Sequence, residues 1–228
     1  MNAVEEIKAQ EGDEIPETPL TTGQMMDLLK DLWSDDKCVI GNALTEIADL
    51  GRRDDDENEI KMRELGGHIA VFQLVQKHVG CLEIEEEGMR ALGNFCRLMP
   101  TKTLLGDIGC VEVILARMEK DRDERIQLLG CTAIASLVRA KGNTERVEKS
   151  GGIAVLVAAM RAHRNCEMVQ SRGCRALSNM SEWEEYRPLI MKAGGASAIA
   201  SAMENYWDHP KLRERASKAL EKLVKKPR

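Results

Sequence analysis

Residues 149–180 read KSGGIAVLVAAMRAHRNCEMVQSRGCRALSNM and contain the pattern on which the fold depends. The glycine pair Gly151-Gly152 supplies a chain break and a sharp turn. After it, apolar residues recur at i, i+3, i+4 and i+7, which places them on one stripe of a helix. A second helix carries Ala176-Leu177. The stripe residues are Ile153, Leu156, Val157 and Met160.

This stretch is one copy of an internal repeat. A glycine-led pair recurs with steps of 43, 42 and 43 residues, at Gly66-Gly67, Gly109-Cys110, Gly151-Gly152 and Gly194-Gly195. An alanine followed by leucine or isoleucine recurs with steps of 48, 42, 43 and 43 residues, at Ala43, Ala91, Ala133, Ala176 and Ala219. Two independent registers that agree predict stacked repeats, because one repeat cannot bury its apolar stripe alone.

Each repeat is predicted to contain two longer helices and a short third one. Three repeats place glycine at one slot near the start of the second helix (Gly88, Gly130 and Gly173), and a small residue there lets neighbouring helices approach closely. The third helix is expected over residues 101–107 and 144–149. Pro100-Thr101 and Asn143-Thr144 are its expected start signals.

The composition favours an all-helical protein. Apolar residues make up 43% of the 228 residues, aromatic residues only 3% and charged residues 31%, a mixture untypical of β-sandwiches and barrels. No apolar run approaches the ~18 residues of a membrane span. The first residues lack the basic start and apolar stretch of a signal peptide, so none is expected.

Charge and cysteine content indicate the surroundings of the protein. The net charge is −5, but residues 1–60 hold five Lys and Arg against seventeen Asp and Glu, while the remaining 168 hold 28 against 21. This split suggests an acidic arm beside a basic surface; alternatively, the acidic residues only keep the chain in solution. Seven cysteines without a CxxC pair argue against a disulfide framework and predict a cytoplasmic location, with the nucleus possible.

Two motifs resemble the armadillo repeat family. Residues 149–157, KSGGIAVLV, resemble its small or acidic residue, glycine pair and apolar helix, and residues 175–180, RALSNM, look like its Trp-Ala-Leu-Ser-Asn-Leu segment. The likeness covers about residues 22–226. It implies a right-handed α-solenoid of about five three-helix repeats over residues 21–228, in units of about 21–65, 66–108, 109–150, 151–193 and 194–228. Residues 1–20 are expected to form an acidic, disordered arm.

The resemblance also implies a peptide-binding site. In that family the longest helix of each repeat lines a concave groove, and its Asn holds the backbone of an extended peptide; Asn94 and Asn179 match that Asn here. Residues three and four positions apart share a helix face, so three rows form a ladder. The candidate peptide-binding residues on the ladder are Arg90, Asn94, Arg97, Thr132, Ser136, Arg139, Arg175 and Asn179.

The arginines point to an acidic or phosphorylated ligand. Nuclear-import adaptors carry Trp where this chain has Arg90 and Arg175, and arginine favours carboxylate or phosphate over a basic signal. Two simpler interpretations remain open. The arginines could pair with Glu on the adjacent repeat, and the asparagines could cap a neighbouring helix. Residues 1–20, or the acidic cluster at residues 54–59, are a candidate internal competitor for the arginines.

No catalytic, metal or cofactor motif is present. The sequence lacks phosphate-binding glycine loops, HExxH and a nucleophile elbow, and His78 with Cys81 is a lone pair. The expected function is a scaffold or adaptor for a protein or peptide partner, without enzyme activity, cofactor, nucleic acid or membrane. Two other functions remain open: a self-associating structural module, and a sensor of an anionic small ligand.

Overall fold

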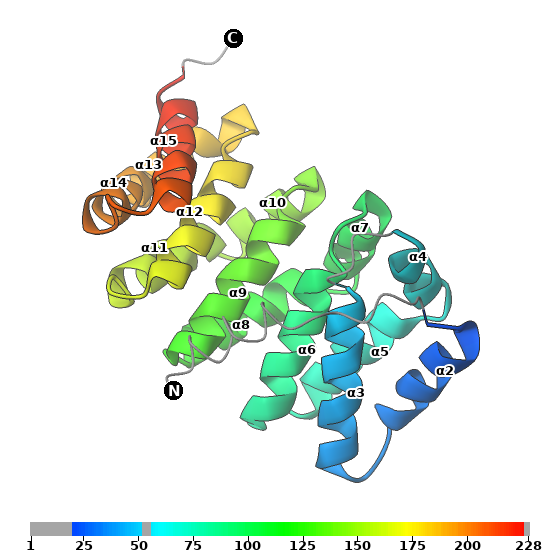
Figure 1. Cartoon of the computed structure of the whole chain (residues 1–228). Coiled ribbons are helices and arrows are strands. Elements are labelled where there is room, and N and C mark those ends of the chain that lie inside the picture. The colour runs from blue at the N-terminus through cyan, green and yellow to red at the C-terminus, as the bar shows by residue number, and fades with distance from the viewer. Residues whose placement is uncertain (1–19, 52–55, 226–228) are drawn as a thin grey trace. The chain divides into compact units, whose positions relative to one another are not determined.

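The computed structural model describes residues 20–51 and 56–225, and this part of the chain consists of helices and turns without strands (Figure 1). The expectation of an all-helical protein is therefore confirmed. The chain divides into two compact units, Met1–Cys110 and Val111–Arg228, called here the N-terminal and the C-terminal unit. Within the described ranges, every helix is too short or too polar to cross a bilayer.

The N-terminal unit begins with a pair of helices and continues with a repeat of two short helices and two longer ones. Its helices are α2 (Thr22–Asp31), α3 (Lys37–Leu50), α4 (Asp56–Glu64), α5 (Gly67–Lys77), α6 (Leu82–Asn94) and α7 (Met99–Asp107). Helix α3 packs along α6, and α5 packs on α6.

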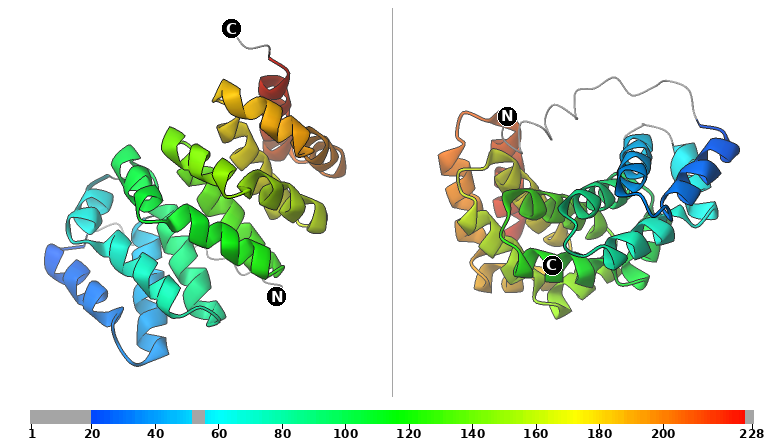
Figure 2. Two further views of the ribbon diagram at one scale, coloured as in Figure 1. Left: turned by 180° about the vertical axis from the view of Figure 1, so that it is seen from behind. Right: turned by 90° about the horizontal axis from the view of Figure 1, so that it is seen from below.

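The C-terminal unit repeats the same order. Its helices are α8 (Cys110–Lys120, which starts at the boundary), α9 (Glu124–Leu137), α10 (Lys141–Lys149), α11 (Gly152–Ala162), α12 (Glu167–Met180), the 3-10 turn η1 (Glu184–Tyr186), α13 (Arg187–Lys192), α14 (Gly195–Asn205) and α15 (Pro210–Val224). The long helices α9, α12 and α15 lie side by side, with α12 in the middle. The view from behind brings α11 to the front (Figure 2).

The glycine pairs form the turns that the sequence predicts. A glycine with positive φ stands directly before α5, α11 and α14: Gly66 (73°), Gly151 (70°) and Gly194 (83°). This is the left-handed backbone region, which residues with a side chain rarely adopt. The second glycine of a pair provides close packing: a Cβ on Gly152 would lie 2.6 Å from Leu115 Cδ1. Each pair therefore turns the chain and also lets two helices approach.

The expected start signal of one short helix is wrong. Helix α10 begins at Lys141, three residues before the expected Thr144. Asn143 and Thr144 lie inside it, where they donate to Leu137 O at 3.0 Å and Val138 O at 2.8 Å. Both side chains cap the carbonyl end of the preceding helix instead of the start of their own. The other short helix, α7, has its Pro at the first turn as expected, but starts at Met99.

The apolar stripes form the core. All four stripe residues of α11 are buried, as are Val111, Ile114, Leu115 and Met118 of α8. At the shared glycine slot, a Cβ on Gly130 would lie 2.4 Å from Met118 Sδ, and a Cβ on Gly173 2.5 Å from Met160 Cγ. The close approach of helices at this slot is thus confirmed.

A buried polar column, absent from the sequence-based predictions, joins consecutive helices. Gln127 Nε2 donates to Met118 O at 2.7 Å and Asp121 O at 2.6 Å; one repeat later, Gln170 Nε2 donates to Met160 O at 2.7 Å and His163 O at 2.9 Å. Each amide satisfies two carbonyls where one helix ends and the next begins. These bonds fix the orientation of the long helices that carry the ladder.

Candidate functional site

Most of the ladder residues lie on the long helices. The expectation of three rows on one helix face is wrong for Arg97 and Arg139, which lie in the turns that follow α6 and α9. Asn94 and Arg90 come from α6 and face α3 in the N-terminal unit; Thr132 and Ser136 come from α9, and Arg175 and Asn179 from α12, in the C-terminal unit. The two sets belong to different units.

The two asparagines bridge neighbouring long helices. Asn94 Nδ2 donates to Ala48 O of α3 at 3.0 Å, and Asn179 Nδ2 donates to Ala135 O of α9 at 2.7 Å. One amide N–H of each therefore serves the fold, as the capping interpretation expects. An asparagine amide has a second N–H and an acceptor oxygen, so a contact with a peptide backbone stays a prediction.

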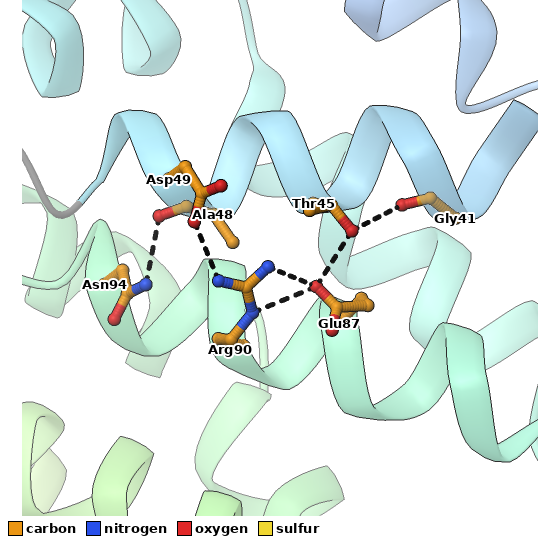
Figure 3. Close-up of polar contacts among 7 residues, drawn as sticks. All are labelled: Gly41, Thr45, Ala48, Asp49, Glu87, Arg90 and Asn94. Carbon is orange, nitrogen blue, oxygen red and sulfur yellow. Dashed lines mark hydrogen bonds and ion pairs between the residues drawn. The ribbon is translucent and has the colours of Figure 1, made fainter. Parts of the chain in front are cut away.

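Arg90 is neutralised inside the N-terminal unit (Figure 3). Its Nη1 lies 2.9 Å from Asp49 Oδ1 of α3, and its Nε and Nη2 lie 2.9 and 2.5 Å from Glu87 Oε2 on its own helix. Thr45 Oγ1 donates to the same Glu87 oxygen at 3.2 Å. Burial lowers the pKa of Arg90, but the bonds and charges of Glu87 and Asp49 outweigh burial and raise this pKa above its usual value. Arg90 is thus a structural cation with two carboxylate partners.

Arg97 is also paired with acid from its own unit. Its Nη2 lies 2.6 Å from Asp56 Oδ1, at the start of α4. Glu59 Oε1 and Oε2 accept from the backbone N–H groups of Leu98 (2.9 Å) and Arg97 (3.2 Å), just before α7. Part of the 54–59 cluster therefore contacts an arginine of the ladder. Residues 54 and 55, and the arm at 1–19, lie outside the described residues.

Thr132 and Ser136 are occupied by their own helix. Thr132 Oγ1 donates to Leu128 O at 2.8 Å, and Ser136 Oγ donates to Thr132 O at 3.3 Å. Ser136 Oγ also accepts from Arg175 Nη2 at 3.1 Å. The serine therefore orients a ladder arginine across the α9–α12 seam.

Four arginines gather on the α9–α12–α15 face, and we call them the arginine cluster: Arg139, Arg172, Arg175 and Arg215. Arg215 Nη1 donates to Ser171 Oγ at 2.5 Å, so a guanidinium also crosses the α12–α15 seam. Burial, followed by the charges of Arg172, Arg215 and Arg139, lowers the pKa of Arg175 to about 10. No carboxylate within the described residues pairs with Arg175. Arg175 is therefore a partly buried cation among like charges.

Two carboxylates of this face, those of Glu182 and Glu214, are paired with lysines. Lys222 Nζ lies 2.5 Å from Glu182 Oε1 and 3.2 Å from Ser178 Oγ, and Lys218 Nζ lies 2.5 Å from Glu214 Oε1. Both acids are thus bonded to lysines, and the charged neighbours that act on Arg175 are arginines.

Sequence reasoning identified Arg139 and Arg175 but missed Arg172 and Arg215. Both lie three residues before the first ladder row, at the position that Val39, Glu87 and Leu129 fill in the other repeats. Extending the i, i+3 rule by one row would have found them.

The described residues contain no group of three or more His, Cys, Asp or Glu side chains placed to hold a metal ion. None of the seven cysteines, all of which fall within the described ranges, forms a disulfide.

The fold is similar to solved armadillo repeat structures. An engineered protein matches with a TM-score of 0.78 and 24% identity, covering 88% of this chain and 79% of that chain. A designed armadillo repeat protein in complex with the peptide (KR)4 matches with a TM-score of 0.77 and 20% identity, covering 88% and 82%. A structure from work on a conserved phosphorylation switch in the interaction between cadherin and beta-catenin matches with a TM-score of 0.76 and 12% identity. It covers 89% of this chain, which spans 39% of that one.

No protein-family model and no curated protein matches the sequence. The similarity to these solved structures shows that the chain has an armadillo-like repeat fold.

Proposed function

We propose that this protein is a binding scaffold that holds an extended acidic segment of a protein partner on its α9–α12–α15 face. The observation that carries the proposal is the arginine cluster, where Arg175 is surrounded by like charges instead of carboxylates. A guanidinium provides five N–H donors in a planar fork that suits carboxylate and phosphate oxygens. Arginines whose only role is to keep a helix surface hydrated would be expected to lie apart from one another, because like charges repel.

The structural neighbours support the scaffold role. One designed armadillo repeat protein binds the basic peptide (KR)4, and beta-catenin interacts with cadherin under a phosphorylation switch. The first of these neighbours shows that such a fold can bind a charged peptide. In this chain the positive face favours an acidic peptide.

The proposed site is narrower than the ladder predicted from the sequence. Arg90 and Arg97 already have carboxylate partners at 2.5–2.9 Å, so an incoming acid would have to displace Glu87, Asp49 or Asp56. We therefore assign ligand selection to Arg139 and Arg175 together with Arg172 and Arg215. A cytosolic or nuclear location is part of the proposal, and it is supported by seven cysteines that form no disulfide.

The test measures binding of two labelled octapeptides, one alternating Asp and Glu and the other (KR)4, by fluorescence anisotropy. The acidic peptide should bind, and Arg175→Gln should weaken its binding about tenfold, because a charge-assisted hydrogen bond contributes about 1.5–3 kcal/mol. Arg122→Gln removes the same charge from the turn before α9, whose first residue, Glu124, lies twelve residues and roughly 18 Å along the helix from Ser136. Equal effects of the two variants, or no binding of the acidic peptide, would refute the proposal.

A further inference from the structure

We propose that the arginine cluster is a recognition site for one phosphoryl group, that of a phosphoserine or phosphothreonine in the bound segment. The inference rests on the proposed function and adds a preference for phosphate over carboxylate. It comes from a comparison of Arg175 with Arg90, which fill the same ladder position two repeats apart.

The chain shows how an arginine at this position is neutralised. Around Arg90 the acid three residues earlier is Glu87, and the acid on the preceding long helix is Asp49. Both contact the guanidinium (Figure 3). The arrangement gives one cation two anionic partners within the fold.

Around Arg175 both of these positions are arginine. The residue three positions earlier is Arg172, and the residue aligned with Asp49 on the preceding repeat is Arg139. Both lower the pKa of Arg175, after burial as the largest cause. The side chains at the two aligned positions are thus acidic around Arg90 and basic around Arg175. The negative charge that neutralises the arginine in the N-terminal unit is therefore missing around Arg175.

The guanidiniums are fixed by neutral groups. Ser136 Oγ accepts from Arg175 at 3.1 Å and Ser171 Oγ accepts from Arg215 at 2.5 Å. A hydroxyl orients a guanidinium without cancelling its charge. Arg175 and Arg215 are therefore held over two adjacent seams, on either side of α12, with their positive charge intact.

A phosphoryl group matches this arrangement better than a carboxylate does. At neutral pH it carries about −1.5 to −2 charges and three strong acceptor oxygens, so it can accept from several guanidiniums together. A carboxylate has one charge and two oxygens, which a single arginine fork satisfies. A partly buried arginine whose charged neighbours are three further arginines thus favours the dianion.

The test uses the full chain and three labelled twelve-residue peptides of Gly and Ala that differ at one central residue: phosphoserine, Asp or Ser. The phosphoserine peptide should bind at least about tenfold more tightly than the Asp peptide. Its affinity should fall between pH 7.5 and pH 5.5, because the second phosphate pKa is about 6, while the affinity of the Asp peptide stays constant. Equal affinities of these two peptides at pH 7.5 would overturn the inference.

The decisive variant is Arg139→Asp/Arg172→Glu, which places acids at the two positions aligned with Asp49 and Glu87, the partners of Arg90. It should abolish the phosphoserine preference while the melting temperature stays equal or rises, because Arg175 gains two carboxylate partners. The matched control Lys120→Asp/Lys192→Glu makes the same change in charge on exposed residues of α8 and α13, outside the ladder helices. It should keep the preference. A preference kept by the first variant, or lost from both, would overturn the inference.

Two further outcomes separate this inference from the proposed function. If the acidic octapeptide binds but phosphoserine gives no advantage, the phosphoryl site is refuted and the scaffold role stands. If neither the octapeptide nor the phosphoserine peptide binds, both are refuted. Inorganic phosphate should compete only at much higher concentration than the phosphoserine peptide; equal potency would instead indicate a site for a free anion.

Discussion

At the scale of single residues, His68 shows how one position can depart from its repeat. The slot holds Val111 and Ile153 in later repeats, and the sequence predicts a half-buried packing residue. The ring is in fact buried, with 2% of its surface exposed, and packs edge-on against Phe95 at 5.2 Å between centroids. It lines a small apolar cavity with Ile47, Met62 and Val71. Burial, followed by the charge of Arg63, lowers the pKa of His68 to about 4.

This burial predicts a loss of stability in mild acid. The unfolded chain binds a proton near the ordinary histidine pKa of 6.5, whereas the folded chain does so only near 4, so the free energy of unfolding falls as the pH drops through that window. The loss should be about 2 kcal/mol at pH 5 and approach about 3 kcal/mol at pH 4. His68→Val should remove this part of the pH dependence. Urea unfolding of both proteins at pH 7 and pH 5 measures the difference; parallel losses would contradict the assignment.

The bonding partners of the individual ladder arginines were the least predictable part of the site. The ladder rows place Arg90 and Arg175 at the same position, but their charge neighbours differ. On the preceding repeat these are Asp49 and Arg139, and three residues earlier on the same helix they are Glu87 and Arg172. The ion-pairing interpretation is correct for Arg90 and does not apply to Arg175. Both results could be predicted from the sequence by comparing two sets of charges: those three residues earlier on the same helix, and those at the aligned position of the preceding repeat.

At the scale of helices, the repeat was predictable because its signals are local. Glycine turns and apolar spacing place the helices. The start of α10 instead depends on tertiary contacts, because its Asn143 and Thr144 donate to carbonyls six residues earlier, at the end of α9.

The residue that faces the shared glycine slot differs between repeats. A Cβ on Gly88 would lie 2.2 Å from Val75 Cγ2, while the aligned partner is Met160 for Gly173. The last repeat has Ala216 at this slot and Met203 at the partner position.

This comparison predicts that Gly88→Ala and Gly173→Ala differ in their effect on stability. Alanine gains about 1 kcal/mol of helix propensity at both sites, but overpacking costs about 1–3 kcal/mol where the neighbour cannot move aside. Val75 is branched and stiff, so Gly88→Ala should lower the free energy of unfolding by about 1 kcal/mol or more. Met160 is flexible, so Gly173→Ala should be close to neutral.

Chemical denaturation of the two variants measures this difference. In Gly88→Ala/Val75→Ala the loss should be smaller than the sum of the single losses, because the clash is removed. A Gly88→Ala protein more stable than the parent would show that the close approach at α6 is not constraining.

At the scale of the whole molecule, charge divides along the boundary between the units. Residues 1–110 hold 11 Lys and Arg against 23 Asp and Glu, and residues 111–228 hold 22 against 15, giving net charges of −12 and +7. The excess of acid includes Glu87, Asp49 and Asp56, which pair with the N-terminal arginines, and the excess of base includes the arginine cluster. The same division that neutralises one set of ladder arginines thus leaves the other set positive.

This division predicts that residues 1–20 compete with an acidic ligand. They hold one Lys and six Asp and Glu, and an acidic segment attached to the same chain acts at an effective concentration in the millimolar range. Deleting them should raise the affinity of the acidic octapeptide severalfold at about 20 mM salt and leave it nearly unchanged at about 300 mM, where exposed charges are screened. Arg175→Gln should reduce the gain from the deletion, because both ligands would then lose the same cation. Unchanged affinity at low salt after the deletion would show that these residues do not reach the arginine cluster.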